Sequence, residues 1–221
     1  LRTDTLAAMG ADVVASLATT NGSDQKKQIQ ALTTAQIQAL TTEQVQALTT
    51  GQIAAFTDKQ LAAFTSGQLN DMSGEQIGSI TTAQIVKMTF ADAGNVDGQL
   101  NNLNTDLVAS LSTAAVAAMT PAQFAALSGD QVAAMTTDQL TSLATNQIIS
   151  LTSTQIGALD TTQVGALTTG QLASLTTAQI VALSGTQLAA IPTDTLPAMT
   201  TAQVRAIEVA DIPSLETAQI E

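Results

Sequence analysis

The stretch ALTTAQIQALTTEQVQALTTGQIAAFT, residues 31–57, repeats one pattern of eight residues three times. In each unit a branched apolar residue follows a glutamine, and a large apolar residue comes three positions later. The branched residue recurs with an unbroken period of eight over more than a hundred residues, which indicates an array of small, similar units. This branched column contains Leu6, Val14, Ile29, Ile37, Val45, Ile53, Leu61, Leu69, Ile77 and Ile85, then every eighth residue from Leu100 and Val108 to Val204, Ile212 and Ile220.

Each unit carries two signals of a helix start. Thr33 and Gln36 have the spacing of a capping box, in which the hydroxyl accepts from the third helical amide and the glutamine accepts from the amide of the cap residue. Leu32 and Ile37 have the spacing of a hydrophobic staple, which packs the residue before the cap against the fourth helical residue. Pro121 takes a first helical position, where proline is favoured. A helix that starts every eight residues has room for about six or seven helical residues, fewer than two turns.

Helices this short are unstable alone in water, so their apolar stripes must be buried by neighbouring repeats. The sequence therefore predicts an all-α fold, a solenoid of one- to two-turn helices with an eight-residue repeat. A continuous helix does not fit, because eight residues rotate the apolar stripe by about 80°. A β-solenoid is the alternative, because threonine, isoleucine and valine favour strands. The unit does not alternate apolar and polar residues, however, and its glutamine, alanine and leucine favour helix.

We interpret residues 1–221 as a single repeat array and expect it to be part of a longer chain, because the pattern is cut at both ends. The period slips twice, and each slip separates neighbouring branched residues by fifteen positions. Turn-forming residues fill both gaps. We interpret them as irregular seams, near residues 18–25 and 89–99, where a loop replaces one short helix.

The last units contain prolines at positions where a normal helix needs an amide. Pro197 and Pro213 directly follow Leu196 and Ile212, and Pro192 takes a cap position. Because proline has no N–H to donate, these units should form shorter helices, close to a single turn.

The composition excludes several classes of function. The chain has no cysteine and no histidine, which removes disulfides, thiolate metal sites and the commonest general base. Its net charge is −12, with only six basic residues, so it cannot displace counterions from nucleic acid or favour an anionic membrane. No apolar run approaches the roughly 18 residues of a membrane span. We expect neither a nucleic-acid partner nor membrane insertion.

The polar columns offer few candidate sites. The glutamine column could bind a polymer or another chain, but capping explains both its residue type and its spacing. The gap residues Asp92, Asn95 and Asp97, or Asn21, Ser23 and Asp24, do not match a calcium loop and are typical of Asx turns. Acids such as Asp106, Asp130, Asp138 and Asp194 complement helix dipoles. We predict no enzymatic activity, no catalytic, cofactor-binding or metal-ligating residues and no cofactor.

The units ALTTAQIQ, ALTTGQLAS and SLTTAQIVAL resemble the octapeptide-repeat regions of large secreted or surface-exposed bacterial proteins that are often described as adhesin-like. The resemblance covers nearly all of residues 29–220, and it implies an extracellular or cell-surface location. The first hypothesis for function is a structural stalk, spacer or matrix component. The alternatives are a filament or sheath subunit that associates with itself, end to end or laterally, and a ligand-binding module. Such a module would use the variable positions Gln30, Gln38, Ala54, Asn70 and Val86.

Overall fold

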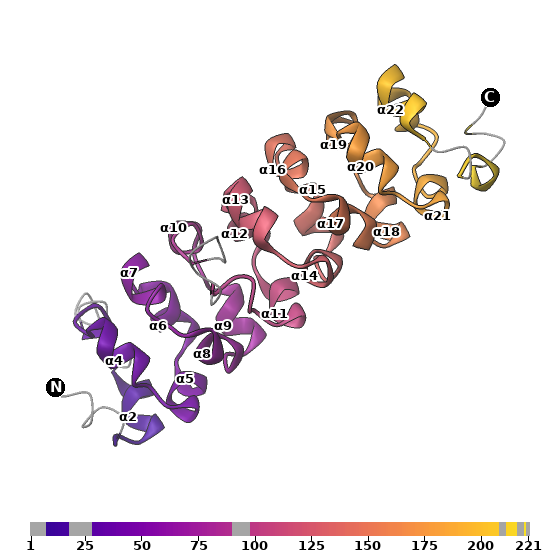
Figure 1. The fold of residues 1–221 in the computed structure, drawn as a ribbon. Helices are drawn as coiled ribbons and strands as arrows, with labels where there is room; N and C mark the ends of the chain where they lie inside the picture. Colours follow the sequence, from indigo (N-terminus) through magenta and orange to yellow (C-terminus); the bar gives the residue numbers. More distant parts are fainter. Residues whose placement is uncertain (1–7, 18–27, 90–97, 208–210, 216–218, 220–221) are drawn as a thin grey trace. The chain divides into compact units, whose positions relative to one another are not determined.

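The computed structural model describes residues 8–17, 28–89, 98–207, 211–215 and 219. In these ranges the chain is a succession of short helices joined by tight turns, and no strand occurs among them (Figure 1). The prediction of an all-α array of very short helices is therefore confirmed, and the β-solenoid alternative is wrong.

The chain divides into two compact units, Leu1–Met119 and Thr120–Glu221. The N-terminal unit contains α2 (Ala11–Ser16), α4 (Thr34–Gln38), α5 (Thr42–Ala47), α6 (Thr50–Ala55), α7 (Asp58–Leu61), α8 (Ser66–Asn70), α9 (Gly74–Gly78), α10 (Thr82–Ile85), α11 (Thr105–Ser110) and α12 (Thr113–Ala118). The C-terminal unit contains α13 (Pro121–Ala126), α14 (Gly129–Ala133), α15 (Thr137–Thr141), α16 (Thr145–Ser150), α17 (Ser153–Ala158), α18 (Thr161–Gly165), α19 (Thr169–Ser174), α20 (Thr177–Val181), α21 (Gly185–Ala189), η1 (Leu196–Ala198), α22 (Thr201–Ala206) and η2 (Ile212–Ser214).

The capping box sets where each helix begins. In α4 the Thr33 N–H donates to Gln36 Oε1 at 2.8 Å, and the Gln36 N–H donates to Thr33 Oγ1 at 3.2 Å. The same reciprocal pair recurs at every helix from α4 to α10. The box satisfies two of the amides that a helix start leaves without an intrahelical partner.

The α-helices are shorter than the sequence suggested, with four to six residues each. Two of the eight residues of an octapeptide repeat have extended backbone, as the repeat that contains α5 shows. Its cap Thr41 has φ −76° and ψ 162°, and the closing Leu48 has φ −61° and ψ 134°. At most six residues of each octapeptide repeat therefore remain for the helix.

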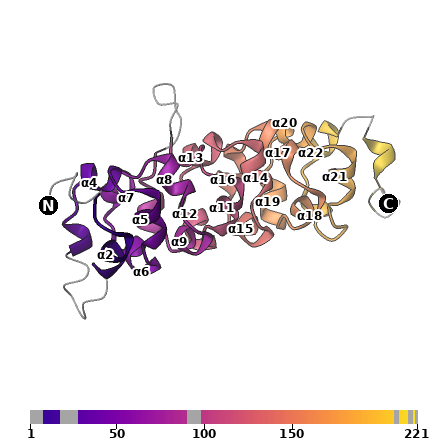
Figure 2. The ribbon, with the colours of Figure 1, turned by 90° about the horizontal axis from the view of Figure 1, so that it is seen from below.

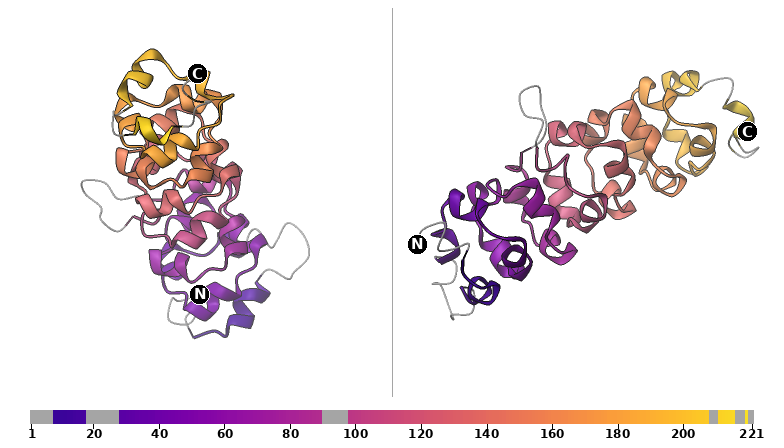
Figure 3. Two further views of the ribbon diagram at one scale, coloured as in Figure 1. Left: turned by 90° about the vertical axis from the view of Figure 1, so that its right-hand side faces the viewer. Right: turned by 60° about the horizontal axis from the view of Figure 1, so that its bottom comes forward.

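Within each unit the helices wind into a superhelix whose successive turns stack on one another (Figure 2). In the N-terminal unit α4 packs on α7 and α6 on α9, and in the C-terminal unit α14 packs on α17 and α16 on α19. Figure 3 shows both units from two further sides. Where the intervening sequence contains neither of the fifteen-residue gaps, hydrogen bonds between stacked turns join residues that are 25 to 31 positions apart, for example Gln30 to Ala55 and Gln60 to Ile29. One turn of the superhelix therefore contains between three and four repeats.

The core of each unit is built from two of the sequence columns. From Val14 to Leu188, the described residues of the branched column are at most 3% exposed. From Leu40 to Ile191 the described residues of the large apolar column are buried beside it. In the N-terminal unit Phe56 and Phe64 meet edge to face with ring centroids 5.2 Å apart. Both partners of most predicted staples thus lie in the core, although Leu32 is only half-buried. This packing supplies the stability that an isolated one-turn helix lacks.

The region of the predicted seam near residues 89–99 contains a widely spaced pair of hydrogen bonds. The Thr89 N–H donates to Gln99 Oε1 at 3.1 Å, and the Gln99 N–H donates to Thr89 Oγ1 at 3.1 Å. These two residues form a capping box although they are ten positions apart instead of three. The additional residues between the two partners are an insertion within this repeat. The described residues 98–103 form turns in place of a helix, and Leu100 and Leu103 are buried, so the array continues in register. Residues 18–25 lie outside the described residues.

The helices of the proline-containing repeats near the C-terminus are short, as predicted. Both η1 and η2 are 3₁₀-helices of three residues, and each has its proline in the first turn. Proline at this position removes an amide that would otherwise extend the regular helix.

Candidate functional site

The glutamine column makes a second set of hydrogen bonds that links successive turns of the superhelix. In the C-terminal unit, Gln171 Nε2 donates to the backbone carbonyls of Leu140 and Leu143, each at 2.9 Å. These acceptors precede the glutamine by 31 and 28 residues. We call this set of bonds the glutamine ladder. Its other members, at the same two offsets, are Gln60, Gln68, Gln76, Gln84, Gln155, Gln163, Gln179, Gln187, Gln203 and Gln219.

The ladder explains why this column is glutamine and not glutamate. Either residue can complete a capping box, because the box needs only an acceptor. The carbonyls at the end of a short helix need donors as well, and only the amide provides them. Gln171 is 2% exposed, so a carboxylate there would be buried against two carbonyl oxygens. Sequence reasoning identified the capping role and missed the role between turns. The absence of glutamate from the column was the available signal.

From Gln28 onward, four repeats have another residue in place of the glutamine: Leu107, Ala115, Thr195 and Asp211. In the first of them, Asn70 from the preceding turn supplies the missing amide group. Asn70 Oδ1 accepts from the N–H of the cap residue Asn104 at 2.8 Å, and Asn70 Nδ2 donates to the Asn102 carbonyl at 2.7 Å. The link between these two turns is therefore reversed, since an earlier residue reaches forward to a later one.

The variable positions proposed for ligand binding do not form one free surface. Gln38 and Ala54 are exposed, whereas Asn70 and Val86 are half-buried. Gln30 Nε2 donates to the Ala55 carbonyl at 3.0 Å, so Gln30 also links two turns. At the corresponding positions Gly157 and Gly165 the neighbouring turn comes close. A Cβ atom added there would lie 3.1 Å from the Ala182 carbonyl oxygen and 2.9 Å from that of Ala190, respectively.

The acidic residues do not gather into a site in the described part of the chain. Asp106, Asp130 and Asp138 lie in the first turns of α11, α14 and α15, as predicted from the helix dipole. Asp194 lies instead in the exposed turn before η1. No group of three acidic residues that could hold a metal ion occurs among the residues described. The gap residues considered as calcium ligands, at 21–24 and 92–97, lie outside the described ranges.

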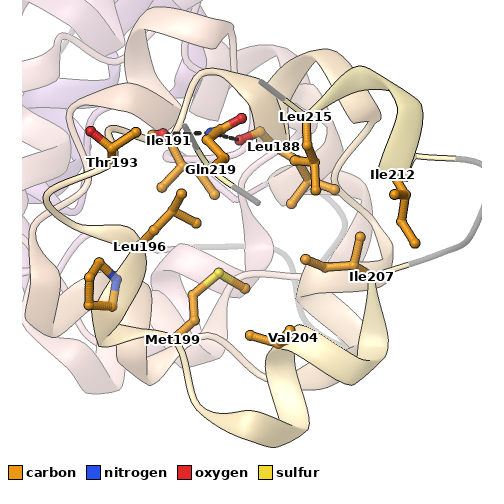
Figure 4. Close-up of a pocket in the computed structure, with 11 residues that line it drawn as sticks. Leu188, Ile191, Thr193, Leu196, Met199, Val204, Ile207, Ile212, Leu215 and Gln219 are labelled. Carbon is orange, nitrogen blue, oxygen red and sulfur yellow. Dashed lines mark hydrogen bonds between the residues drawn. The ribbon is translucent and has the colours of Figure 1, made fainter. Parts of the chain in front are cut away.

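An apolar cavity of about 610 Å³ opens in the last turn of the C-terminal unit (Figure 4). Val204 and Ile212 belong to the branched column that is buried elsewhere, but here they are 53% and 45% exposed. The cavity is the interior of a superhelical turn whose apolar columns remain accessible. Its lining residues are Leu188, Ile191, Thr193, Leu196, Pro197, Met199, Val204, Ile207, Ile212, Leu215 and Gln219.

The fold and the ladder define an all-α octapeptide-repeat protein, in which both the core and the polar network repeat every eight residues. A family model described as the ALTTAQ repeat matches residues 25–58, 108–145 and 132–169. The predicted octapeptide is therefore the ALTTAQ repeat in these segments. A search among curated proteins found no match. No helix in the described ranges is long and apolar enough to cross a membrane.

Proposed function

We propose that this chain is a non-enzymatic structural element, a stalk or spacer in an adhesin-like protein at the bacterial cell surface. The glutamine ladder carries the proposal. Its amides, the most regular polar groups of the chain, are directed to backbone carbonyls of the neighbouring turn and not to solvent. The polar network therefore serves to stack turns.

The length of a spacer can be adjusted if repeats can be added without changing the contacts between turns. Each glutamine of the ladder bonds within its own repeat and with the turn before it, so further repeats can extend the stack through the same contacts. The net charge of −12 supports solubility of such an array. The resemblance to repeat regions of secreted adhesin-like proteins supports the location outside the cell.

The location is tested on intact cells that produce the protein naturally. Antibodies against the chain should label these cells without permeabilisation, and external protease should remove the signal. An antibody against a cytosolic protein controls for leakage. Labelling that requires permeabilisation would contradict the proposed location.

The spacer role is tested by changing length and surface separately. Deletion of residues 145–168 removes three repeats and joins Ala144 to Thr169 in register, so it should shorten the array and reduce adhesion by the cells. Gln38→Ala combined with Ala54→Gln alters two exposed positions at constant length and should leave adhesion unchanged. The opposite pattern, with adhesion lost only after the surface exchange, would favour the ligand-binding module.

A further inference from the structure

We propose that the N-terminal unit contains a weak joint, an interface between two turns that opens by local unfolding before the other interfaces of the unit do. The weak joint is the interface at which α11 and α12 stack on α9 and α10. The inference goes beyond the spacer proposal and does not rest on it, because the contacts between turns define the joint.

The preceding interface of the same unit is closed by consecutive glutamines of the ladder. Gln68 Nε2 donates to the carbonyls of Ile37 and Leu40, each at 2.9 Å. Gln60, Gln76 and Gln84 make the equivalent pairs of bonds. The amides of four successive repeats must therefore release their acceptors before these turns separate.

Two repeats at the weak joint cannot make such bonds, because Leu107 and Ala115 take the place of glutamine. Their side chains are buried, with 5% and 0% exposure, so apolar atoms lie where the amide lies elsewhere. At the first of these repeats Asn70 compensates, through its bonds to Asn102 and Asn104.

No such compensation occurs at Ala115. The register follows from Gln99, whose Nε2 donates to two carbonyls that precede it by 38 and 35 residues, across the insertion. The residues at the same two offsets before Ala115 are Ile77 and Ile80. In the described part of the chain no side chain donates to either of these two carbonyls. Ala115 therefore leaves both acceptors without the amide that this position supplies in other turns.

This vacancy weakens the interface because the acceptors remain. Ile80 is 2% exposed, and a buried carbonyl that loses its donor keeps the cost of its removal from water. Arrays of this kind open in cooperative segments, and the interface with the weakest coupling opens first. The turns on either side keep their glutamine bonds while the weak joint is open, so the array can lengthen there reversibly.

The test is hydrogen exchange of the folded 221-residue chain in urea below the unfolding transition, followed by mass spectrometry. Amides of α11 and α12 should exchange at least about tenfold faster than those of α5 and α6, which have ladder bonds to both neighbouring turns. Ala115→Gln should slow exchange in α11 and α12 by about tenfold. The variant keeps the cap of α12, because Ser112 Oγ already accepts from the N–H of residue 115 at 3.1 Å.

The matched control is Ala114→Gln, at an exposed alanine of the same helix, which should exchange as the wild type does. Gln76→Ala makes the reverse change, because it removes the amide from the carbonyls of Val45 and Leu48. It should speed exchange in α5 by about tenfold. Circular dichroism verifies that each variant is folded.

Equal exchange in the two pairs of helices of the wild type would overturn the proposal. Slowing of exchange by Ala114→Gln to the same extent as by Ala115→Gln would also overturn it, and so would a folded Ala115→Gln that exchanges as the wild type does. If Ala115→Gln does not fold, Gln76→Ala decides, and unchanged exchange in α5 would count against the proposal. Each of these results would leave the spacer role intact, because that role is tested by location and length.

Discussion

Gln171 Nε2 lies 2.9 Å from the carbonyl oxygen of Leu143, a residue 28 positions earlier in the chain. The same side chain closes its own capping box, because Gln171 Oε1 accepts from the Thr168 N–H at 3.1 Å. One amide therefore starts a helix with its oxygen and joins two turns with its nitrogen.

Gln171→Glu should destabilise the chain in a pH-dependent way. The introduced carboxyl keeps the acceptor for the box but loses the donor, and burial raises its pKa in the folded state. A raised pKa means that stability is greatest below the unfolded value of about 4.3 and is lost as the pH rises. Relative to wild type, the cost at pH 7 should be about 3 kcal/mol or more, and it should shrink near pH 4. Urea unfolding at both pH values measures it.

The control for that substitution is Gln38→Glu, at an exposed position. Its effect at either pH should stay within about 0.5 kcal/mol. An equal loss of stability at the two positions would mean that general charge repulsion, not burial in the ladder, is responsible.

The caps can be changed in both directions. The cap of α16 is Ala144, whose N–H donates to Gln147 Oε1 at 2.8 Å but which has no side-chain oxygen to return the bond. Ala144→Thr at this exposed position should complete the box and stabilise the chain by about 1 kcal/mol, and Thr41→Ala should cost about 1 kcal/mol. Thermal melting measures both. Changes of the same sign in the two variants would contradict a capping role.

The exchange between Asn70 and Leu107 can be tested with a double-mutant cycle. Asn70→Ala should cost about 1–3 kcal/mol, because the Asn104 N–H and the Asn102 carbonyl lose their partners. Leu107→Gln restores the usual glutamine, and it should be more favourable in the Asn70→Ala background than in the wild type. Additive effects would show that the two side chains do not substitute for one another.

The insertion within the Thr89–Gln99 box should be dispensable. Deletion of residues 90–96 leaves the segment Thr-Asp-Gly-Gln, which has ordinary box spacing. The shortened chain should keep its helical circular dichroism and gain up to about 1 kcal/mol, because a shorter loop loses less entropy on closure. A loss of helix would show that the inserted residues contribute to the fold. Chelator should not change the melting of either chain.

Damage to one repeat should stay local at first. Ile37 is fully buried, and Ile37→Ala should cost about 2 kcal/mol, near the low end for large-to-small core changes because the core is thin. Since each repeat contacts only nearby units, hydrogen exchange should show lost protection around residues 25–60. Protection beyond residue 130 should change little. A uniform loss along the chain would show that the array unfolds as one cooperative body.

The sequence by itself determined the helices, because their signals act over three or four residues. A capping box requires only the spacing of Thr33 and Gln36, and a hydrophobic staple requires only the spacing of Leu32 and Ile37. The exact period then implies a stack of similar units, and Pro197 and Pro213 predict the short helices near the C-terminus. None of these inferences requires knowledge of a contact beyond one octapeptide repeat and the repeat next to it.

The tertiary structure alone decided how the repeats stack. The number of repeats per turn depends on contacts between residues 25 to 31 positions apart, and no local signal specifies that distance. The same contacts give the glutamine amides their acceptors and let Asn70 replace a missing glutamine. A capping box fixes the direction of its own helix only. Side-chain packing between turns selects which carbonyls and which apolar residues meet.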